Sequence, residues 1–318
     1  MNDKKIAFVL PFYGKLPIWF EAFVISCSFN SSITWLIFTD LIYDGKLPEN
    51  VLFKKLNKQE LTQLIYKKTG IKHELSNPHK LCDFKPMYGL IFDDYLTNYN
   101  YWGHCDMDII WGDLTSFFTK IEFENYDIIS TRKNAISGHL TLYKNKTEIN
   151  TFFKSVPNYK KAFTDINYQG FDEGYFSYHL FNEVEKNRAK FNIFWPERSS
   201  IDRMELQLKP NGWYWEQGEI KNKSGLLGIY LHMIDWKKSM LGVSQITSKN
   251  THKLYINKYG IWDKIPINIK IRTLFDLGIK QQISYKINSL KSFVKYKLLG
   301  KPYPKMKANV IDGYKVLE

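Results

Sequence analysis

The feature that most constrains this chain is the twelve-residue run YWGHCDMDIIWG, residues 101–112. A β-prone aromatic start leads into two carboxylates one residue apart, Asp106 and Asp108, and an apolar exit follows. The pattern is typical of a buried strand whose last turn holds Mg²⁺ or Mn²⁺, because both ions prefer hard oxygen ligands. It also fits a polar strand end that caps a turn. About one such pair is expected by chance among 17 Asp in 318 residues, so the neighbouring sequence must decide.

Short apolar runs alternate with segments of helical periodicity over the first hundred residues. The predicted strands there are residues 6–10, 33–39 and 51–56, and the predicted helices are residues 19–29, 59–69 and 81–96. This alternation predicts an α/β fold with a mixed, mainly parallel sheet flanked by helices. Ligands of such sheets bind at the carboxyl ends of the strands. Asp40, Asp106 and Asp108 are all expected at that edge.

Further elements are expected after the central strand. The strands are residues 126–130, 140–143 and 230–233, and the helices are residues 147–155 and 170–182. The chain has no internal repeat and no low-complexity linker. Its length suits one large domain with an appendage, or two domains. We therefore expect a catalytic domain over residues 1–262 and a basic helical extension over residues 263–318.

The formal net charge of +13 is concentrated in this extension, because residues 264–307 contain eleven Lys and Arg but only one acid, Asp276. Such a tail indicates a polyanionic partner. Residues 281–299 place apolar side chains at helical spacing with lysines beside them, which suits a helix lying on an anionic membrane. The same helix could equally dock on the catalytic domain. Nucleic acid is not expected, because no base-reading motif accompanies the charge.

The cellular location is predicted from what the sequence lacks. Three widely spaced cysteines, Cys27, Cys82 and Cys105, form no metal or disulfide framework and indicate reduced thiols. Residues 1–15 imitate a signal peptide, but Pro11 interrupts the apolar run. No run approaches the ~18 apolar residues that a transmembrane helix needs. We expect a cytoplasmic protein associated peripherally with the inner face of the membrane.

Four stretches, in this order, resemble nucleotide-sugar-dependent glycosyltransferases of the GT-A fold, and most closely the bacterial polysaccharide-biosynthesis transferases of the DUF6625 type. They are IAFVLPFYG leading to ITWLIFTD, KLCDFKP at residues 80–86, HCDMD at residues 104–108, and LHMIDWKK at residues 231–238. The resemblance covers about residues 5–240. It implies a GT-A-like (Rossmann-like) catalytic domain and a hexosyltransferase that uses a nucleotide-sugar donor, with a UDP-sugar favoured.

The resemblance implies donor-binding roles for three residues in the first half of the chain. Asp40 would accept hydrogen bonds from a base or ribose, and Asp83 from a ribose or uracil. Lys85 would offer its charge to the diphosphate. The residues also have simpler interpretations, because Asp40 can cap a turn and residues 80–86 can begin a solvated helix.

The resemblance also implies a Mn²⁺ or Mg²⁺ ion bound by the D-x-D carboxylates. Asp108 would be the closer ligand, and Asp106 would act through water or touch the ribose. The stretch from residue 231 to residue 238 resembles the H-x-x-G-x-x-K-P-W element of glycogenin-like enzymes, which implies that His232 is a third metal ligand and that Lys237 contacts the diphosphate. The middle Gly and the final Pro-Trp are missing here. His232 also fits a satisfied core histidine.

The acidic pair Asp172-Glu173 resembles the Asp-Glu that opens a helix in blood-group-type transferases. The resemblance implies that one carboxylate acts as a base toward the acceptor or stabilises an oxocarbenium-like centre, with retention of configuration favoured. The simpler interpretation is a pair of acids at a helix N-terminus. Gly138, which precedes a predicted strand, would permit close approach of a sugar.

Together these features predict a metal-dependent glycosyltransferase that extends a bacterial surface glycan, such as lipopolysaccharide or capsule. The acceptor would be lipid-linked, with polyprenyl as the expected carrier, which gives the basic tail a purpose. The rival hypothesis is a non-catalytic module of a polysaccharide-assembly complex. A metal-dependent phosphotransferase is less favoured, because no G-x-x-x-x-G-K-[ST] motif is present.

Overall fold

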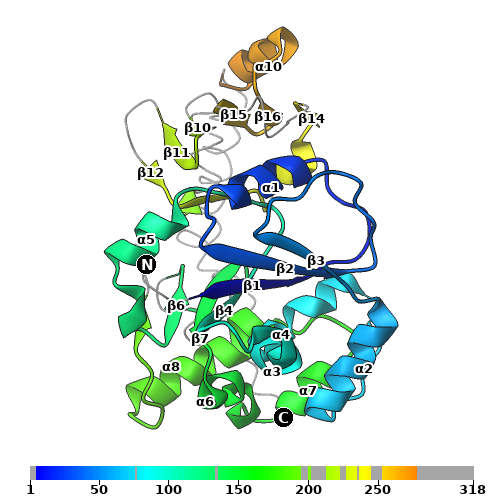
Figure 1. Ribbon diagram of the computed structural model, residues 1–318, viewed down its shortest axis with the longest axis vertical. Helices are drawn as coiled ribbons and strands as arrows, with labels where there is room; N and C mark the ends of the chain where they lie inside the picture. The colour runs from blue at the N-terminus through cyan, green and yellow to red at the C-terminus, as the bar shows by residue number, and fades with distance from the viewer. Residues whose placement is uncertain are drawn as a thin grey trace, which may run out of the picture.

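The computed structural model describes residues 5–75, 77–132, 135–194, 200–201, 213–222, 227–234, 236–244 and 253–277 (Figure 1). Within these residues the central sheet has seven strands in the order β3-β2-β1-β4-β7-β6-β8. Their bounds are β1 Ile6–Pro11, β2 Ile33–Thr39, β3 Val51–Lys55, β4 Tyr101–Cys105, β6 Ile128–Ser130, β7 Leu140–Lys144 and β8 Ile193–Phe194. Strands β3, β2, β1 and β4 pair in parallel, and β7 is antiparallel to both β4 and β6. The predicted mixed, mainly parallel sheet is confirmed.

Helices cover both faces of this sheet (Figure 1). One face packs against α1 and α5, and the other packs against α2, α3, α4, α6, α7 and α8. The bounds are α1 Phe20–Ser28, α2 Lys58–Thr69, α3 Tyr88–Ile91, α4 Asp93–Leu96, α5 Leu114–Lys120, α6 Thr147–Asn150, α7 Tyr159–Thr164 and α8 Ser177–Glu185. In β1, Ala7 and Val9 join one core and Phe8 and Leu10 join the other. A strand buried on both faces therefore reads as one continuous apolar run.

The single helix predicted over residues 81–96 is wrong. The segment forms η1 (Pro78–Cys82), η2 (Lys85–Met87), α3 and α4 in succession. Pro86 has no N–H to donate to a preceding turn, which favours short, tight turns over one α-helix. At Phe92 the backbone leaves the helical region, with φ −107° and ψ 21°. The segment therefore bends around the core, where it also buries Lys80 and Lys85.

Two other predicted helices are also divided. Residues 147–155 form α6 and then η4 (Phe152–Ser155). Residues 170–182 begin as a π-helix, η5 (Phe171–Phe176), before α8 continues the segment. π-helical turns are rare and are frequently found at functional sites, and this one carries both predicted catalytic acids.

A second sheet, which sequence analysis did not predict, lies above α1 in Figure 1. Its described strands have the order β12-β11-β10-β15-β16-β14. The bounds are β10 Trp213–Glu216, β11 Glu219–Asn222, β12 Leu227–Gly228, β14 Gly242–Val243, β15 Lys253–Asn257 and β16 Gly260–Trp262. Trp213 and Trp215 share a core with Ala22 and Ile25 of α1. Burial of these side chains joins the second sheet to the first layer of helices.

Three short strands form a third sheet in addition to the central sheet and the second sheet. Strand β13 (Tyr230–His232) lies between β5 (Ile109–Trp111) and β9 (Ser200–Ile201). It is antiparallel to β5, and His232 is the residue opposite Ile109. This register carries a residue from the last part of the chain to the position immediately after the D-x-D turn.

The described part of the tail is α10 (Ile267–Leu277). The amphipathic helix predicted over residues 281–299 lies outside the described residues, and the division at residue 262 stays a prediction. Within the described ranges no helix is long and apolar enough to cross a membrane.

We expect Gly103→Ala to destabilise the central sheet. Gly103 lies in β4, and a Cβ atom there would be 2.5 Å from the carbonyl oxygen of Thr141 and 2.7 Å from the ring of Phe8. Backbone on one side and a buried ring on the other leave little room to adjust, so the loss should be about 1–3 kcal/mol. Urea denaturation measures it, with Gln63→Ala on the exposed face of α2 as a control expected to change stability by less than about 0.5 kcal/mol. A Gly103→Ala protein as stable as the control would contradict this packing.

Candidate active site

The D-x-D turn lies at the edge of the sheet where ligands of α/β proteins bind. From β1 the chain moves outward to β2 and β3 and then returns to place β4 on the other side of β1. Open α/β sheets bind their ligands at such a reversal, which lies here at the carboxyl ends of β1 and β4. Asp106 follows the last residue of β4, and its N–H donates to the carbonyl of His139 at 3.1 Å. The Trp19 indole donates to the carbonyl of Met107 at 3.1 Å, which fixes the turn from the other side.

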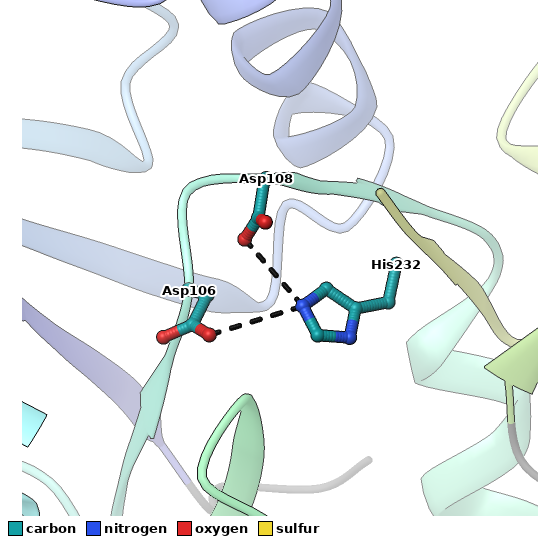
Figure 2. Close-up of side chains that lie close together, drawn as sticks. All are labelled: Asp106, Asp108 and His232. Carbon is teal, nitrogen blue, oxygen red and sulfur yellow. Dashed lines mark ion pairs between the residues drawn. The ribbon is translucent and has the colours of Figure 1, made fainter. Parts of the chain in front are cut away.

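Asp106, Asp108 and His232 converge at this turn (Figure 2). One ligand atom from each lies within 4.8 Å of the others. The Nε2 atom of His232 is 3.6 Å from Oδ1 of Asp108 and 3.8 Å from Oδ2 of Asp106. Although buried, this nitrogen has no hydrogen-bond partner. Two carboxylates and an unpartnered imidazole nitrogen form a donor set that fits a divalent cation.

A lysine lies beside each carboxylate. Lys237, in η6 (Trp236–Ser239), places Nζ 2.5 Å from Oδ2 of Asp108, and Lys85 places Nζ 2.6 Å from Oδ1 of Asp106. Burial alone would raise the pKa of Asp108, but His232 and Lys237 outweigh burial and hold the pKa well below its usual range. Burial likewise opposes the charge on Lys85, yet the neighbouring Asp106 raises the pKa of Lys85 well above its usual value. Asp108 and Lys85 are therefore both charged near neutral pH.

Gly138 links the acidic pair to Lys85, which lies beside the cluster of possible metal ligands. The N–H of Gly138 donates to Oε1 of Glu173 at 2.8 Å, and its carbonyl accepts from Lys85 at 2.6 Å. A Cβ atom on Gly138 would lie 2.9 Å from Oδ2 of Asp172 and 3.0 Å from Oε1 of Glu173, so a glycine lets both carboxylates approach. The sequence-based prediction for Gly138 concerned a sugar; in the structure the close neighbours are the two acids.

The two acids have different environments. Asp172 is buried, and burial raises its pKa to about 7, although the charge of Lys85 opposes the rise. The Glu173 side chain is 37% exposed and forms an ion pair with Arg132 at 3.1 Å. Asp172 is therefore able to change protonation state near neutral pH, while Glu173 is the acid that reaches solvent.

Asp83 lies apart from the cluster of possible metal ligands. Its side chain has no exposed surface and forms an ion pair with Lys80 at 2.8 Å. Its carboxylate also accepts from the backbone N–H groups of Gln169 and Phe171. A nucleotide could reach Asp83 only if this segment moved, so the donor-binding role expected for Asp83 stays a prediction.

Asp40 is exposed at the carboxyl end of β2. Burial, together with the charges of Asp40 and Glu60, raises the pKa of Tyr13. The buried hydroxyl of Tyr13 has no hydrogen-bond partner. The base or ribose contact expected for Asp40 likewise stays a prediction.

Sequence analysis did not predict that His139 and Tyr230 hold the ring of His232 in place. The ring of His139 stacks on the ring of His232, with centroids 4.2 Å apart and planes at 22°. The Nε2 atom of His139 is 2.7 Å from the hydroxyl of Tyr230, which shares a face of β13 with His232. Tyr230 and His232 are two residues apart in a predicted strand, and that spacing is the signal that could have identified the pair. His104 is buried beside Tyr143.

Several solved structures are similar to this chain at low sequence identity. No curated protein sequence matches this chain. Among solved structures, the galactosyltransferase LgtC in complex with donor and acceptor sugar analogues is 8% identical, with a TM-score of 0.37 over 72% of this chain and 86% of its own. Apo mouse xyloside xylosyltransferase 1 is 9% identical, with a TM-score of 0.35 over 64% and 90%. The glycosyltransferase GlyE of Streptococcus pneumoniae TIGR4 is 12% identical, with a TM-score of 0.36 over 92% and 64%.

A sequence-family model gives a more direct assignment. The model for a family of unknown function, DUF6625, matches residues 8–261, which include every predicted site residue and all of the central and second sheets except Ile6 and Ala7 of β1 and Trp262 of β16. The chain therefore belongs to the DUF6625 family.

Proposed function

We propose that this protein is a metal-dependent glycosyltransferase of the GT-A type, which moves a sugar from a nucleoside diphosphate donor to a glycan acceptor. The observation that carries the proposal is the convergence of Asp106, Asp108 and the unpartnered His232 at the switch point of the sheet. Lys85 and Lys237 stand beside the two carboxylates. A bound cation with free coordination positions, next to the flexible side chain of Lys237, would suit the binding of a diphosphate.

In the donor half of the site, some residues would hold the cation and others would bind the diphosphate or orient a metal ligand. Asp106, Asp108 and His232 would hold Mn²⁺ or Mg²⁺, which supplies Lewis-acid stabilisation of the leaving diphosphate. Lys237 has a third of its side chain exposed and can exchange Asp108 for a phosphate oxygen. Lys85 is buried between Asp106 and Gly138, so its role is to orient Asp106.

The acceptor half of the proposal rests on the acidic pair. Glu173 reaches solvent and can accept a proton from an acceptor hydroxyl or stabilise positive charge at the reacting carbon. Asp172, buried behind it, adds a second carboxyl whose charge depends on pH near 7. We favour retention of configuration, and NMR of the product linkage compared with the donor would decide it.

A UDP-sugar is the proposed donor, and a bacterial surface glycan on a polyprenyl lipid at the cytoplasmic face is the proposed acceptor. The charge of residues 264–307 supports attachment to an anionic membrane. Within that segment, α10 exposes the apolar side chains of Ile267 and Ile271 and the basic side chain of Lys270. We propose no binding of nucleic acid.

The metal cluster predicts that Asp108→Asn keeps the fold but loses at least about 100-fold in kcat/KM for Mn²⁺-dependent donor hydrolysis, because a neutral amide is a poor ligand for a hard cation. Asp44→Asn, an exposed matched control, should behave as wild type. Full wild-type activity in EDTA would remove the metal from the reaction. Failure of the wild type to bind nucleoside diphosphates or hydrolyse donors would favour a non-catalytic assembly module.

The environment of Asp172 predicts a pH-dependent effect on stability in EDTA. The folded pKa of about 7 lies above the unfolded value, so the folded protein binds this proton more tightly and loses stability as pH rises from about 4 to 7. Asp172→Asn avoids that loss. Its unfolding free energy, relative to wild type, should increase with pH by up to about 1.4 kcal/mol per unit in this window. Urea denaturation at pH 5 and pH 7 measures the change, and no difference between these pH values would contradict it.

The same Asp172→Asn variant tests the proposed chemistry. If the carboxyl acts at the reacting carbon, the variant should bind the donor as wild type does while the chemical step slows. Normal turnover would reduce Asp172 to a structural acid at the start of η5.

The basic tail predicts salt-sensitive membrane binding. Full-length protein should float with anionic vesicles at low salt and remain behind with neutral vesicles, because each lysine near the surface adds about 1 kcal/mol. Salt should weaken the attachment. Truncation after Trp262 should preserve transfer to a short water-soluble acceptor and reduce transfer to a lipid-linked one. Absence of flotation, or unfolding of the truncated protein, would place the tail with the catalytic domain.

A further inference from the structure

Lys80 and Asp83 form a buried ion pair that the proposed reaction does not use. Both side chains have 0% exposure, and Nζ of Lys80 is 2.8 Å from Oδ2 of Asp83. Neither residue belongs to the cluster of possible metal ligands. Removing two charges from water is costly, and a buried ion pair is weak evidence of a stabilising role. The pair therefore calls for another explanation.

Within the described residues, the hydrogen bonds that this pair makes outside its own segment go to one backbone stretch, residues 162–171. Lys80 donates to the carbonyls of Ala162, at 2.5 Å, and Asn167, at 2.9 Å. Asp83 accepts from the N–H groups of Gln169, at 2.9 Å, and Phe171, at 2.7 Å. The cation thus binds carbonyls before η5, and the anion binds N–H groups where η5 begins.

The geometry at the start of η5 explains why a charge is needed there. The first N–H groups of a helix have no partner within the helix, and Phe171 is the first residue of η5. A carboxylate that accepts from one such group, the N–H of Phe171, and from the N–H of Gln169 just before the helix forms strong, directional bonds and opposes the partial positive charge of the helix start. Because Asp83 bonds to residue 169 and to residue 171, it sets where the π-helix starts.

The start of η5 in turn sets the positions of the two acids. Asp172 immediately follows the residue whose N–H Asp83 accepts, and Glu173 comes next. Glu173 accepts from the N–H of Gly138 at 2.8 Å. Asp172 is buried close enough to Lys85 to interact with its charge. A shift of one residue in the start of η5 would displace both acids from these positions.

We propose that Lys80 and Asp83 are positioning residues, which fix the start of η5 and thereby place Asp172 and Glu173 against the Gly138 loop. This inference rests on the proposed function, in which those acids act on the acceptor. In the segment KLCDFKP, residues 80–86, Lys80 and Asp83 would therefore position the two acids. Lys85 would orient Asp106 in the cluster of possible metal ligands.

The test compares Asp83→Asn with Asp93→Asn. The second variant removes a partly exposed ion pair with Lys68 and leaves η5 untouched. In Asp83→Asn, amide hydrogen exchange should accelerate in residues 167–176 and remain at the wild-type rate in β1 and β2. Turnover should fall about 10- to 100-fold, as expected for a misplaced reacting group, with unchanged KM for the donor and unchanged Mn²⁺ affinity. Asp93→Asn should match wild type in all four measurements.

A double-variant cycle separates positioning from direct contact. If Asp83 acts through the acids, Asp83→Asn should cost little further turnover in an Asp172→Asn/Glu173→Gln background. An equal loss in both backgrounds would overturn the proposal. A raised donor KM with normal turnover would also overturn it and would restore the nucleotide contact.

The proposal can still be tested if Asp83→Asn does not fold or if the wild-type protein is inactive. If Asp83→Asn does not fold, Lys80→Met/Asp83→Asn removes both buried charges together, a change that proteins tolerate better than loss of one partner; the same exchange and turnover results are expected from it. If wild-type protein transfers no sugar, the proposed function fails, but the exchange pattern still tests whether the pair fixes η5. Wild-type exchange in residues 167–176 of the variant would overturn the inference in either case.

Discussion

The buried ammonium of Lys85 is the interaction on which the geometry of the site depends. It donates to Asp106 at the end of β4 and to the carbonyl of Gly138 in the loop before β7. An unpaired charge at this depth would be strongly unfavourable, so its partners must be present and correctly placed. The same ammonium therefore orients Asp106, a possible metal ligand, and holds the loop whose N–H contacts Glu173. One side chain joins the cluster of possible metal ligands to the acidic pair.

A second constraint is the pairing of β13 with β5. The N–H of Met233 donates to the carbonyl of Asp108 at 2.8 Å, so the backbone that carries His232 is attached directly to the D-x-D turn. His139 then stacks on the His232 ring from the side of the Gly138 loop. The imidazole is fixed by backbone pairing and by packing, which leaves its Nε2 atom available to a cation. Ligand and support thus come from widely separated parts of the chain.

Several features could be predicted because their signals are local. Strands β1 and β2 are short apolar runs buried on both faces, and the α/β class follows from their alternation with helices. Asp106 and Asp108 could be recognised as possible ligands from spacing alone. His232 was harder to assign, since the sequence does not show that β13 pairs with β5; the register that carries it there depends on the whole fold.

Other features depend on burial, which a single sequence does not reveal. Lys80, Asp83 and Lys85 are polar, so residues 80–86 fitted a solvated helix start, but all three side chains are buried in the structure. The long helix over residues 81–96 was wrong for a related reason: Pro86 and these buried charges favour short turns that follow the core. The second sheet was missed because its strands are two to five residues long and gain their stability from packing against α1.

The central claim is that the cluster of two aspartates and one histidine is a metal centre for a nucleoside diphosphate. The most direct measurement is anomalous diffraction at the manganese edge from crystals grown with Mn²⁺ and UDP. The account predicts one strong peak in contact with Asp106, Asp108 and His232, with the diphosphate of UDP completing its coordination and lying next to Lys237. A well-ordered cluster without a manganese peak, or UDP bound away from it, would contradict the account.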